Sequence, residues 1–172
     1  YALRDDRVYN VGRLDADTSG LLILTNDGEL ANMLAHPKFG VSKTYVAKVE
    51  GLVTSQEINQ LLKGVQLEDG LMSADKANLV DSNPYESLVE ITIHSGKNRV
   101  VRRMFDSIGH PVKDLVRRQF GPIQLGPLKP GQTRLLSKVE IGALLKAAQN
   151  STKEPKASAT KPGPKPRGRK RW

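Results

Sequence analysis

The chain of 172 residues has 27 Lys and Arg against 18 Asp and Glu, a formal net charge of +9, and no cysteine. This length suffices for one cored domain and excludes two large ones, and without cysteine neither disulfides nor thiolate chemistry are available. No stretch is long and apolar enough to span a membrane and no signal-peptide pattern is present, so we expect a cytoplasmic protein.

The positive charge is concentrated near the C-terminus. Residues 153–172 hold eight Lys or Arg and one acid, a net charge of +7, which leaves only +2 for residues 1–152. This Pro- and Gly-rich segment has almost nothing to bury. We therefore predict one domain over residues 1–149 and a disordered basic tail over residues 150–172. The tail is either a tether to RNA phosphates or a solubilising terminus.

The first chemical motif is the segment Gly12–Gly20, GRLDADTSG, which precedes the apolar run Leu21–Leu24. The run predicts a buried strand that ends at the turn Asn26–Gly28. A carboxylate beside such a strand is held firmly, while the flanking glycines let a ligand approach closely. Asp15 is therefore the candidate reactive group. An aspartate here is also typical of a turn, and Asp17 competes with Asp15 as the acid.

Two helices are predicted after this motif. Asp27 is a typical N-cap for a short helix. The apolar face of that helix comprises Leu30, Met33 and Leu34. The segment Thr54–Glu57, TSQE, is a capping box that opens a second helix, and Gly64 suits its C-terminal end. The residues expected to face inward from the second helix are Ile58, Leu61 and Leu62.

Two strands are predicted from the alternation of apolar and polar residues. The first covers Thr44–Glu50 and stops at Gly51. The second runs through Val89, Ile91 and Ile93. Helices separated by alternating strands predict an α+β fold with an antiparallel or mixed sheet.

The second chemical motif, Ser95–Phe105, SGKNRVVRRMF, follows the second strand. It predicts a helix with Asn98 as its N-cap and Gly109 as its stop. One helical stripe is apolar, comprising Val101, Met104, Phe105 and Ile108. The opposite side carries Arg99, Arg102, Arg103 and Asp106. An anion should bind at the helix start beside Lys97 and Arg99, although an ordinary amphipathic surface helix would show the same pattern.

Several motifs in the same order resemble the rRNA pseudouridine synthases, in the branch that modifies small- and large-subunit ribosomal RNA. They are Gly12–Leu22 with Thr25–Gly28, then Gly96–Met104, Ile108–Val112, Gly121–Ile123 and Leu128–Gly131. The resemblance spans roughly Val11 to Leu145, and ordered motifs are more specific than one short match. It implies a catalytic domain whose mixed, mostly antiparallel sheet is flanked by helices. Val100 departs from the family, which often has Gln there.

The resemblance implies isomerisation of a uridine in ribosomal RNA to pseudouridine, without a redox change and hence without a cofactor. The matched position for the nucleophile is Asp15, and Arg102 occupies the position that pairs with this aspartate. Tyr45 matches the aromatic residue that packs against the flipped uracil and serves in proton transfer. Arg13 is expected to contact phosphate or fill the vacated stack. The remaining residues expected to bind RNA are Lys43, Lys97, Asn98, Arg99 and Arg103.

Other interpretations stay open at this point. A non-catalytic RNA-binding or ribosome-assembly module on the same fold is the main alternative. The chain begins at Tyr1 and lacks the family's Lys-Pro-Gly segment and small N-terminal RNA-binding module, so we expect an N-terminally incomplete catalytic domain. The Lys-Thr-Tyr segment and the basic extension favour a large-subunit rRNA substrate, and a monomer is expected. The three scattered histidines indicate no metal site.

Overall fold

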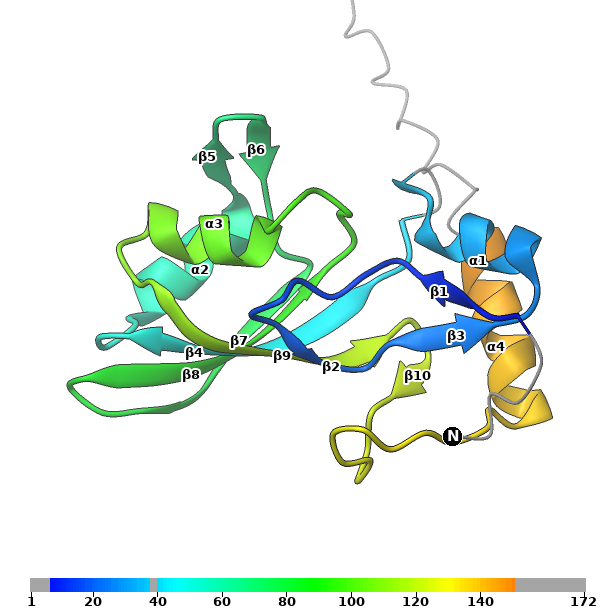
Figure 1. Ribbon diagram of the computed structural model, residues 1–172. Coiled ribbons are helices and arrows are strands. Elements are labelled where there is room, and N and C mark those ends of the chain that lie inside the picture. The colour runs from blue at the N-terminus through cyan, green and yellow to red at the C-terminus, as the bar shows by residue number, and fades with distance from the viewer. Residues whose placement is uncertain (1–6, 38–39, 151–172) are drawn as a thin grey trace, which may run out of the picture.

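The computed structural model describes residues 7–37 and 40–150, and its centre is a six-stranded sheet (Figure 1). The main path runs β10-β9-β4-β8-β7, and β2 pairs with β9 off this path. All pairings are antiparallel except the parallel pair β2–β9. The expected α+β fold with a mixed, mostly antiparallel sheet is confirmed. The strands are β2 (Ser19–Gly20), β4 (Lys43–Glu50), β7 (Lys76–Ser82), β8 (Glu86–Ile93), β9 (Val112–Phe120) and β10 (Ile123–Gln124).

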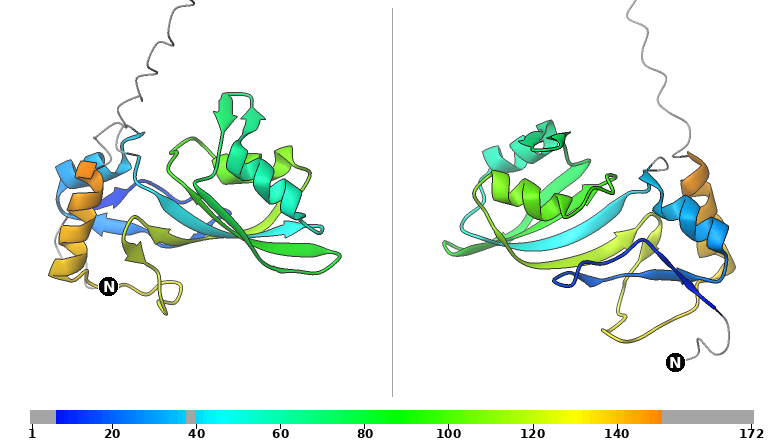
Figure 2. Two further views of the ribbon diagram at one scale, coloured as in Figure 1. Left: turned by 180° about the vertical axis from the view of Figure 1, so that it is seen from behind. Right: turned by 45° about the horizontal axis from the view of Figure 1, so that its top comes forward.

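Two small sheets and four helices complete the described part of the chain. The strand pairs are β1 (Tyr9–Val11) with β3 (Ile23–Thr25), and β5 (Val65–Leu67) with β6 (Gly70–Met72). The helices are α1 (Gly28–Ala35), α2 (Ser55–Lys63), α3 (Val100–Ser107) and α4 (Lys138–Asn150). In Figures 1 and 2, α2 and α3 lie over one end of the central sheet beside the β5–β6 hairpin. Helices α1 and α4 lie at the other end, with β1 and β3.

Each end of the sheet has its own apolar core. Under α2 and α3, fully buried Phe105 and Met104 pack with the inward residues of β4 and β8. At the other end, Phe120 and Leu34 belong to a second cluster that joins α1 and α4 to β1 and β3. The segment from β1 to β3, which includes the first motif, is thereby anchored on one core. The start of α3, which includes the second motif, is anchored on the other.

The predicted helix ends are largely confirmed. Asp27 caps α1 by accepting a hydrogen bond from the backbone N–H of Leu30, 3.1 Å away. Thr54 caps α2 by accepting from the backbone N–H of Glu57, and Gly64 follows the helix with φ +125°. Leu62 is a wrong core prediction, because its side chain is 37% exposed. One helical step of about 100° from fully buried Leu61 carries Leu62 to the edge of the packed face.

Two further boundaries differ from the sequence predictions. The strand expected over Leu21–Leu24 is Ile23–Thr25, because the backbone N–H of Leu21 instead donates to the carbonyl of Arg117 on β9, at 2.9 Å. The N-cap of α3 is Arg99, not Asn98, and no side chain caps that end.

Helix α4 was not predicted, and it includes Asn150, the first residue of the expected tail. The rest of that tail, residues 151–172, lies outside the described residues. No helix among the described residues has the length and apolar character to cross a membrane.

Candidate active site

A cavity of about 320 Å³ lies between the first motif, strand β4 and the start of α3. Eight of the nine residues singled out from the sequence line it. These are Arg13, Asp15, Lys43, Tyr45, Lys97, Asn98, Arg99 and Arg102. The structure therefore brings together two motifs that are more than seventy positions apart in the chain. The ninth residue, Arg103, is not among the lining residues.

The segment that carries Asp15 is held by backbone contacts at its C-terminal end. The N–H of Thr18 donates to the carbonyl of Asp15 at 2.9 Å, which closes a turn. Strand β2 then runs parallel to β9, with Gly20 opposite Arg117. A Cβ on Gly20 would lie 2.2 Å from the carbonyl oxygen of Arg117, and the φ of Gly20 is +113°. Only glycine allows the two strands to approach this closely.

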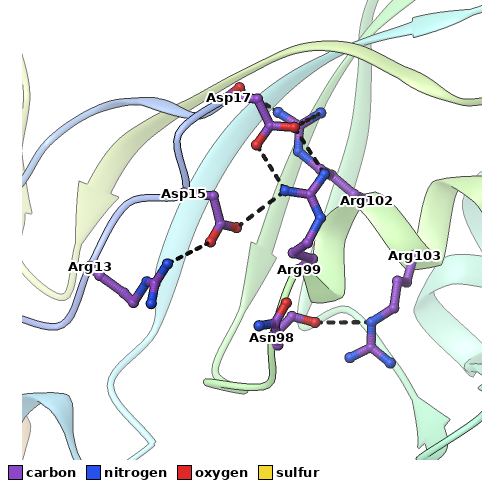
Figure 3. A network of polar contacts seen from close by, with 7 residues as sticks. All are labelled: Arg13, Asp15, Asp17, Asn98, Arg99, Arg102 and Arg103. Carbon is purple, nitrogen blue, oxygen red and sulfur yellow. Dashed lines mark hydrogen bonds and ion pairs between the residues drawn. The ribbon is translucent and has the colours of Figure 1, made fainter.

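The Asp15 carboxylate lies between two guanidinium groups, those of Arg13 and Arg99 (Figure 3). Arg13 Nη2 and Arg99 Nη1 each lie 3.9 Å from an Asp15 oxygen, and the Asp15 side chain is 29% exposed. At this separation the contacts are ionic rather than hydrogen bonds. The Asp15 carboxylate therefore remains partly exposed and open to a ligand.

Asp17 binds the arginines more closely than Asp15 does. Arg99 donates to both Asp17 oxygens at 2.9 Å, and Arg102 Nη1 lies 3.5 Å from Asp17 Oδ2. Arg102 Nη2 also donates to the backbone carbonyl of Asp17 (Figure 3). The hydrogen bonds from Arg99 are the main cause that lowers the pKa of the Asp17 carboxyl to about 2. Asp17 is thus an anchor for these two arginines.

The expected ion pair between Arg102 and Asp15 is not formed in this structure. Arg102 pairs with Asp17 instead, because the backbone carbonyl and the carboxylate of Asp17 together offer it two acceptors. The Arg102 side chain is only 11% exposed, and its Nε is buried without a partner within the described residues. Arg102 lines the cavity as expected, but the nearest arginines to the Asp15 carboxylate are Arg13 and Arg99.

The loop before α3 is tied to the β5–β6 hairpin. Arg103 donates to both carboxylate oxygens of Asp69 at 2.7 and 3.2 Å, and its Nε donates to the carbonyl of Asn98 at 2.9 Å. The Lys97 ammonium donates to the backbone carbonyl of Asp69 at 2.9 Å. The Arg103 hydrogen bond is the main cause that lowers the pKa of the Asp69 carboxyl. Arg103 therefore holds the loop in place from outside the cavity.

Within this loop, Arg99 has a left-handed backbone, with φ of 49°. It is the one non-glycine residue with positive φ among those the structure describes. This conformation is disfavoured for a side chain of its size. The two hydrogen bonds to Asp17 hold the Arg99 guanidinium across the cavity mouth despite that backbone.

Apolar residues and Tyr45 also line the cavity. Tyr45 on β4 lies between Ile91 of β8 and Arg117 of β9 in the sheet register, and it packs partly buried against the core under α2 and α3. Ile93 and Leu115 are among the apolar lining residues. Phe120 is a second aromatic residue in the lining, and apolar side chains with aromatic rings suit a planar heterocyclic base.

Sequence reasoning missed Arg117 and Thr18 as cavity residues. Arg117 is 3% exposed, and its Nε donates to the carbonyl of Leu21 at 2.8 Å. Across the described residues, three buried side-chain polar atoms lack a hydrogen-bond partner: Thr18 Oγ1, Arg102 Nε and Arg117 Nη2. All three residues line this cavity. Because native proteins pair nearly all such atoms, their gathering here indicates a site for a polar ligand. The sequence signal that could have identified Arg117 is a charged residue at an inward-facing position of a strand.

No metal centre is found among the described residues, since no group of three or more His, Cys, Asp or Glu side chains is arranged to hold an ion. Two of the histidines serve in pairs with acids. His94 contacts Asp75 at 2.8 Å, and buried His110 contacts Glu57 and the carbonyl of Glu50.

A model of the RNA pseudouridylate synthase family matches residues 2–107, which is more than half of the chain. The chain belongs to this family. The matched segment contains both motifs that meet in the cavity, with Asp15, Tyr45 and Arg102, and it ends before Arg117.

Curated relatives and a solved structure agree with the family. An uncharacterized RNA pseudouridine synthase of Aquifex aeolicus is 46% identical over 142 residues, covering 83% of this chain and 57% of that protein. Ribosomal large subunit pseudouridine synthase B of Bacillus subtilis is 47% identical over 140 residues, with coverage of 80% and 57%. The chain thus spans a little over half the length of these relatives.

Among solved structures, a crystal structure of a pseudouridylate synthase matches with a TM-score of 0.69 and 32% identity, over 80% of this chain and 59% of that one. An archaeal box H/ACA Nop10–Cbf5 complex matches with a TM-score of 0.51 at 17% identity, which is a likeness of fold alone. The α+β fold described above is therefore the fold of a pseudouridylate synthase.

Proposed function

We propose that the protein isomerises a uridine of ribosomal RNA, in the large subunit, to pseudouridine, with Asp15 as the nucleophile. The observation that carries the proposal is one cavity that combines a partly exposed carboxylate, an aromatic ring and three buried polar atoms without partners. The names of the relatives support RNA as the substrate, and the Bacillus subtilis relative is called a ribosomal large subunit synthase.

In this reaction the bond from the sugar C1′ to uracil N1 breaks and a bond from C1′ to uracil C5 forms. The proton lost from C5 is balanced by one gained at N1, so no oxidant, reductant or cofactor is consumed. Asp15 attacks as a carboxylate, and a covalent step splits one difficult substitution into two easier ones. The guanidinium groups of Arg13 and Arg99, each 3.9 Å from an Asp15 oxygen, limit the motion of that carboxylate.

The base has to leave its stack to reach Asp15, and this costs stacking energy. Tyr45 offers a ring face inside the cavity that returns part of this energy. It is also our candidate for the proton transfer at C5. Asp17 and Arg102 act as positioning residues in this scheme. Asp17 binds the guanidinium groups of Arg99 and Arg102, which lie around Asp15.

The test compares ribosomal RNA from cells without the gene before and after incubation with purified protein. Pseudouridines are mapped by carbodiimide labelling and primer extension, and the wild-type protein should restore a stop at one uridine of the large-subunit RNA. Asp15→Asn should abolish the stop while retaining RNA affinity. The matched control is Asp114→Asn, which removes an exposed charge on β9 outside the cavity and should leave the stop unchanged.

Two outcomes would contradict the proposal. Turnover by Asp15→Asn would remove Asp15 from the nucleophile's role. RNA binding by the wild-type protein without any new pseudouridine would favour the non-catalytic RNA-binding or ribosome-assembly module instead. A new pseudouridine in small-subunit RNA would refute the large-subunit assignment alone.

A further inference from the structure

Two cations, Lys43 and Arg117, line the same cavity as Asp15, and neither has an acidic partner among the described residues. Lys43 lies two residues before Tyr45 on β4, and Arg117 lies opposite Tyr45 on β9. Residues two apart on a strand share a face and are separated by roughly 7 Å. The two cations therefore lie beside Tyr45, the residue whose ring we expect to stack on the uracil base.

The contacts of these cations are incomplete. Arg117 Nε donates to the carbonyl of Leu21, whereas Arg117 Nη2 is buried and has no hydrogen-bond partner in the described part of the chain. The Lys43 ammonium lies 5.9 Å from the ring centroid of Phe120, and the Arg117 guanidinium lies 5.4 Å from the same centroid. Within residues 7–37 and 40–150, no carboxylate forms an ion pair with either cation. Burial is the main cause, and the charge of Arg117 a further cause, that lowers the pKa of Lys43.

Other arginines near the cavity are paired. Arg99 and Arg102 bind Asp17, and Arg103 binds Asp69. Two neighbouring cations without an anion are unfavourable in a site shielded from water, because a buried charge needs a partner. The aromatic face of Phe120 compensates them only in part. An anionic group from a ligand would complete this set of charges.

We propose that Lys43 and Arg117 form a binding site for a backbone phosphate of the RNA, directly adjacent to the uridine held by Asp15 and Tyr45. The inference rests on the proposed function for the identity of that uridine. The phosphate brings negative charge to both cations and fixes the nucleotide beside the base. Arg117 is thus a substrate-binding residue in addition to the structural contact with Leu21.

The first experiment uses inorganic phosphate as the probe. Thermal unfolding of the chain is followed in phosphate and in chloride at equal ionic strength. A ligand that binds the folded state raises the melting temperature, and removal of a charged hydrogen bond weakens such binding by about tenfold. Lys43→Met should lose most of the phosphate-dependent rise. The matched control Arg118→Met removes the neighbouring exposed charge on β9 and should keep it.

The second experiment uses a short adenosine oligonucleotide with one central uridine. Its affinity for the Asp15→Asn protein is measured against salt concentration, so that binding is read without turnover. Each lost phosphate contact to single-stranded RNA reduces the slope of log K against log salt by about 0.7. Lys43→Met should show this reduction, and Arg118→Met should not. Replacement of the phosphate beside the uridine by a neutral methylphosphonate should weaken RNA binding by the protein that has Lys43. It should leave RNA binding by Lys43→Met unchanged.

These readouts separate the possible occupants of the site. A fall in affinity with an unchanged slope would assign the cations to an uncharged oxygen of the base and overturn the proposal. A phosphate-dependent stabilisation without any change in the RNA slope would identify a site for free phosphate and also overturn it. Equal losses in Arg118→Met would show a non-specific charge effect.

A matched set of variants keeps the test independent of folding. Arg117→Lys retains the positive charge and loses the contact with Leu21, so it should bind RNA with the wild-type slope where it folds. Lys43→Met carries the test by itself where Arg117 variants do not fold. Failure of the proposed isomerase is distinguishable, because the slope can fall in Lys43→Met even when the wild-type protein forms no pseudouridine.

Discussion

Replacement of Gly20 by alanine tests how the segment carrying Asp15 is held. The new Cβ would meet the Arg117 backbone at 2.2, 2.6 and 2.9 Å, distances at which β2 and β9 have to separate. Overpacking of this kind costs about 1–3 kcal/mol. The backbone conformation at φ +113° adds about 1–3 kcal/mol for a residue with a side chain. We expect a loss of about 4 kcal/mol in the free energy of unfolding.

For a chain of this size, about 4 kcal/mol corresponds to a fall of roughly 10 °C in melting temperature. Gly126→Ala is the matched control, because Gly126 also has positive φ, +57°, but nothing within 4 Å of the added Cβ. It should cost only about 1–2 kcal/mol. Thermal unfolding followed by circular dichroism measures both variants.

The same substitution should also impair function while the protein is folded. Displacement of β2 moves the turn between Asp15 and Thr18, so pseudouridine formation by Gly20→Ala should fall at a temperature well below its melting point. Gly126→Ala should retain activity there. Equal melting temperatures for the two variants would refute the inferred close approach of β2 and β9. If Gly20→Ala is destabilised but remains fully active, the pairing of β2 with β9 does not determine the position of Asp15.

Three further predictions concern stability. Thr54→Ala removes the α2 cap and should lower the free energy of unfolding by about 1 kcal/mol in urea titrations, whereas Thr54→Ser should not. Phe105→Ala empties a fully buried position and should cost about 3–5 kcal/mol; a loss no larger than that of Thr54→Ala would contradict the core assignment. The Arg134 hydrogen bond lowers the pKa of Glu140 from 4.5 to about 2, so this pair stabilises the fold above about pH 4.5 and ceases to do so as the pH falls through about 2. Melting temperatures of wild type and Glu140→Gln should therefore differ near neutral pH and converge near pH 2, and a constant difference would exclude the ion pair as its cause.

The sequence predicted those elements whose signals are local. The caps at Asp27 and Thr54 and the alternation in β4 and β8 depend on neighbouring residues only, and they are confirmed. Strand β2 could not be predicted, because it consists of two residues and exists through its pairing with β9. The strand expected at Leu21 begins later for the same reason. The N–H of Leu21 donates to the carbonyl of Arg117, nearly a hundred residues away.

The candidate site divides in the same way. The motifs indicated which residues meet in the cavity, because residue types and order identify a family. They did not indicate which arginine binds which aspartate. Asp15 and Asp17 are two residues apart, and the choice of Arg102 between them depends on where α3 starts relative to the loop. Arg103 likewise binds Asp69 on a hairpin that no sequence signal had placed there.

The distribution of charge pairs connects the nearly balanced composition of residues 1–152 with a site for an anionic polymer. Most arginines around the cavity are neutralised by carboxylates, so they shape the site and contribute little net attraction for RNA. Lys43 and Arg117 have no such partner within residues 7–37 and 40–150, and they lie next to Tyr45 in the sheet. A phosphate gains most where it meets charge that the protein itself has not neutralised. The contribution of residues 7–150 to RNA affinity should therefore depend more on Lys43 and Arg117 than on the more numerous, paired arginines at α3.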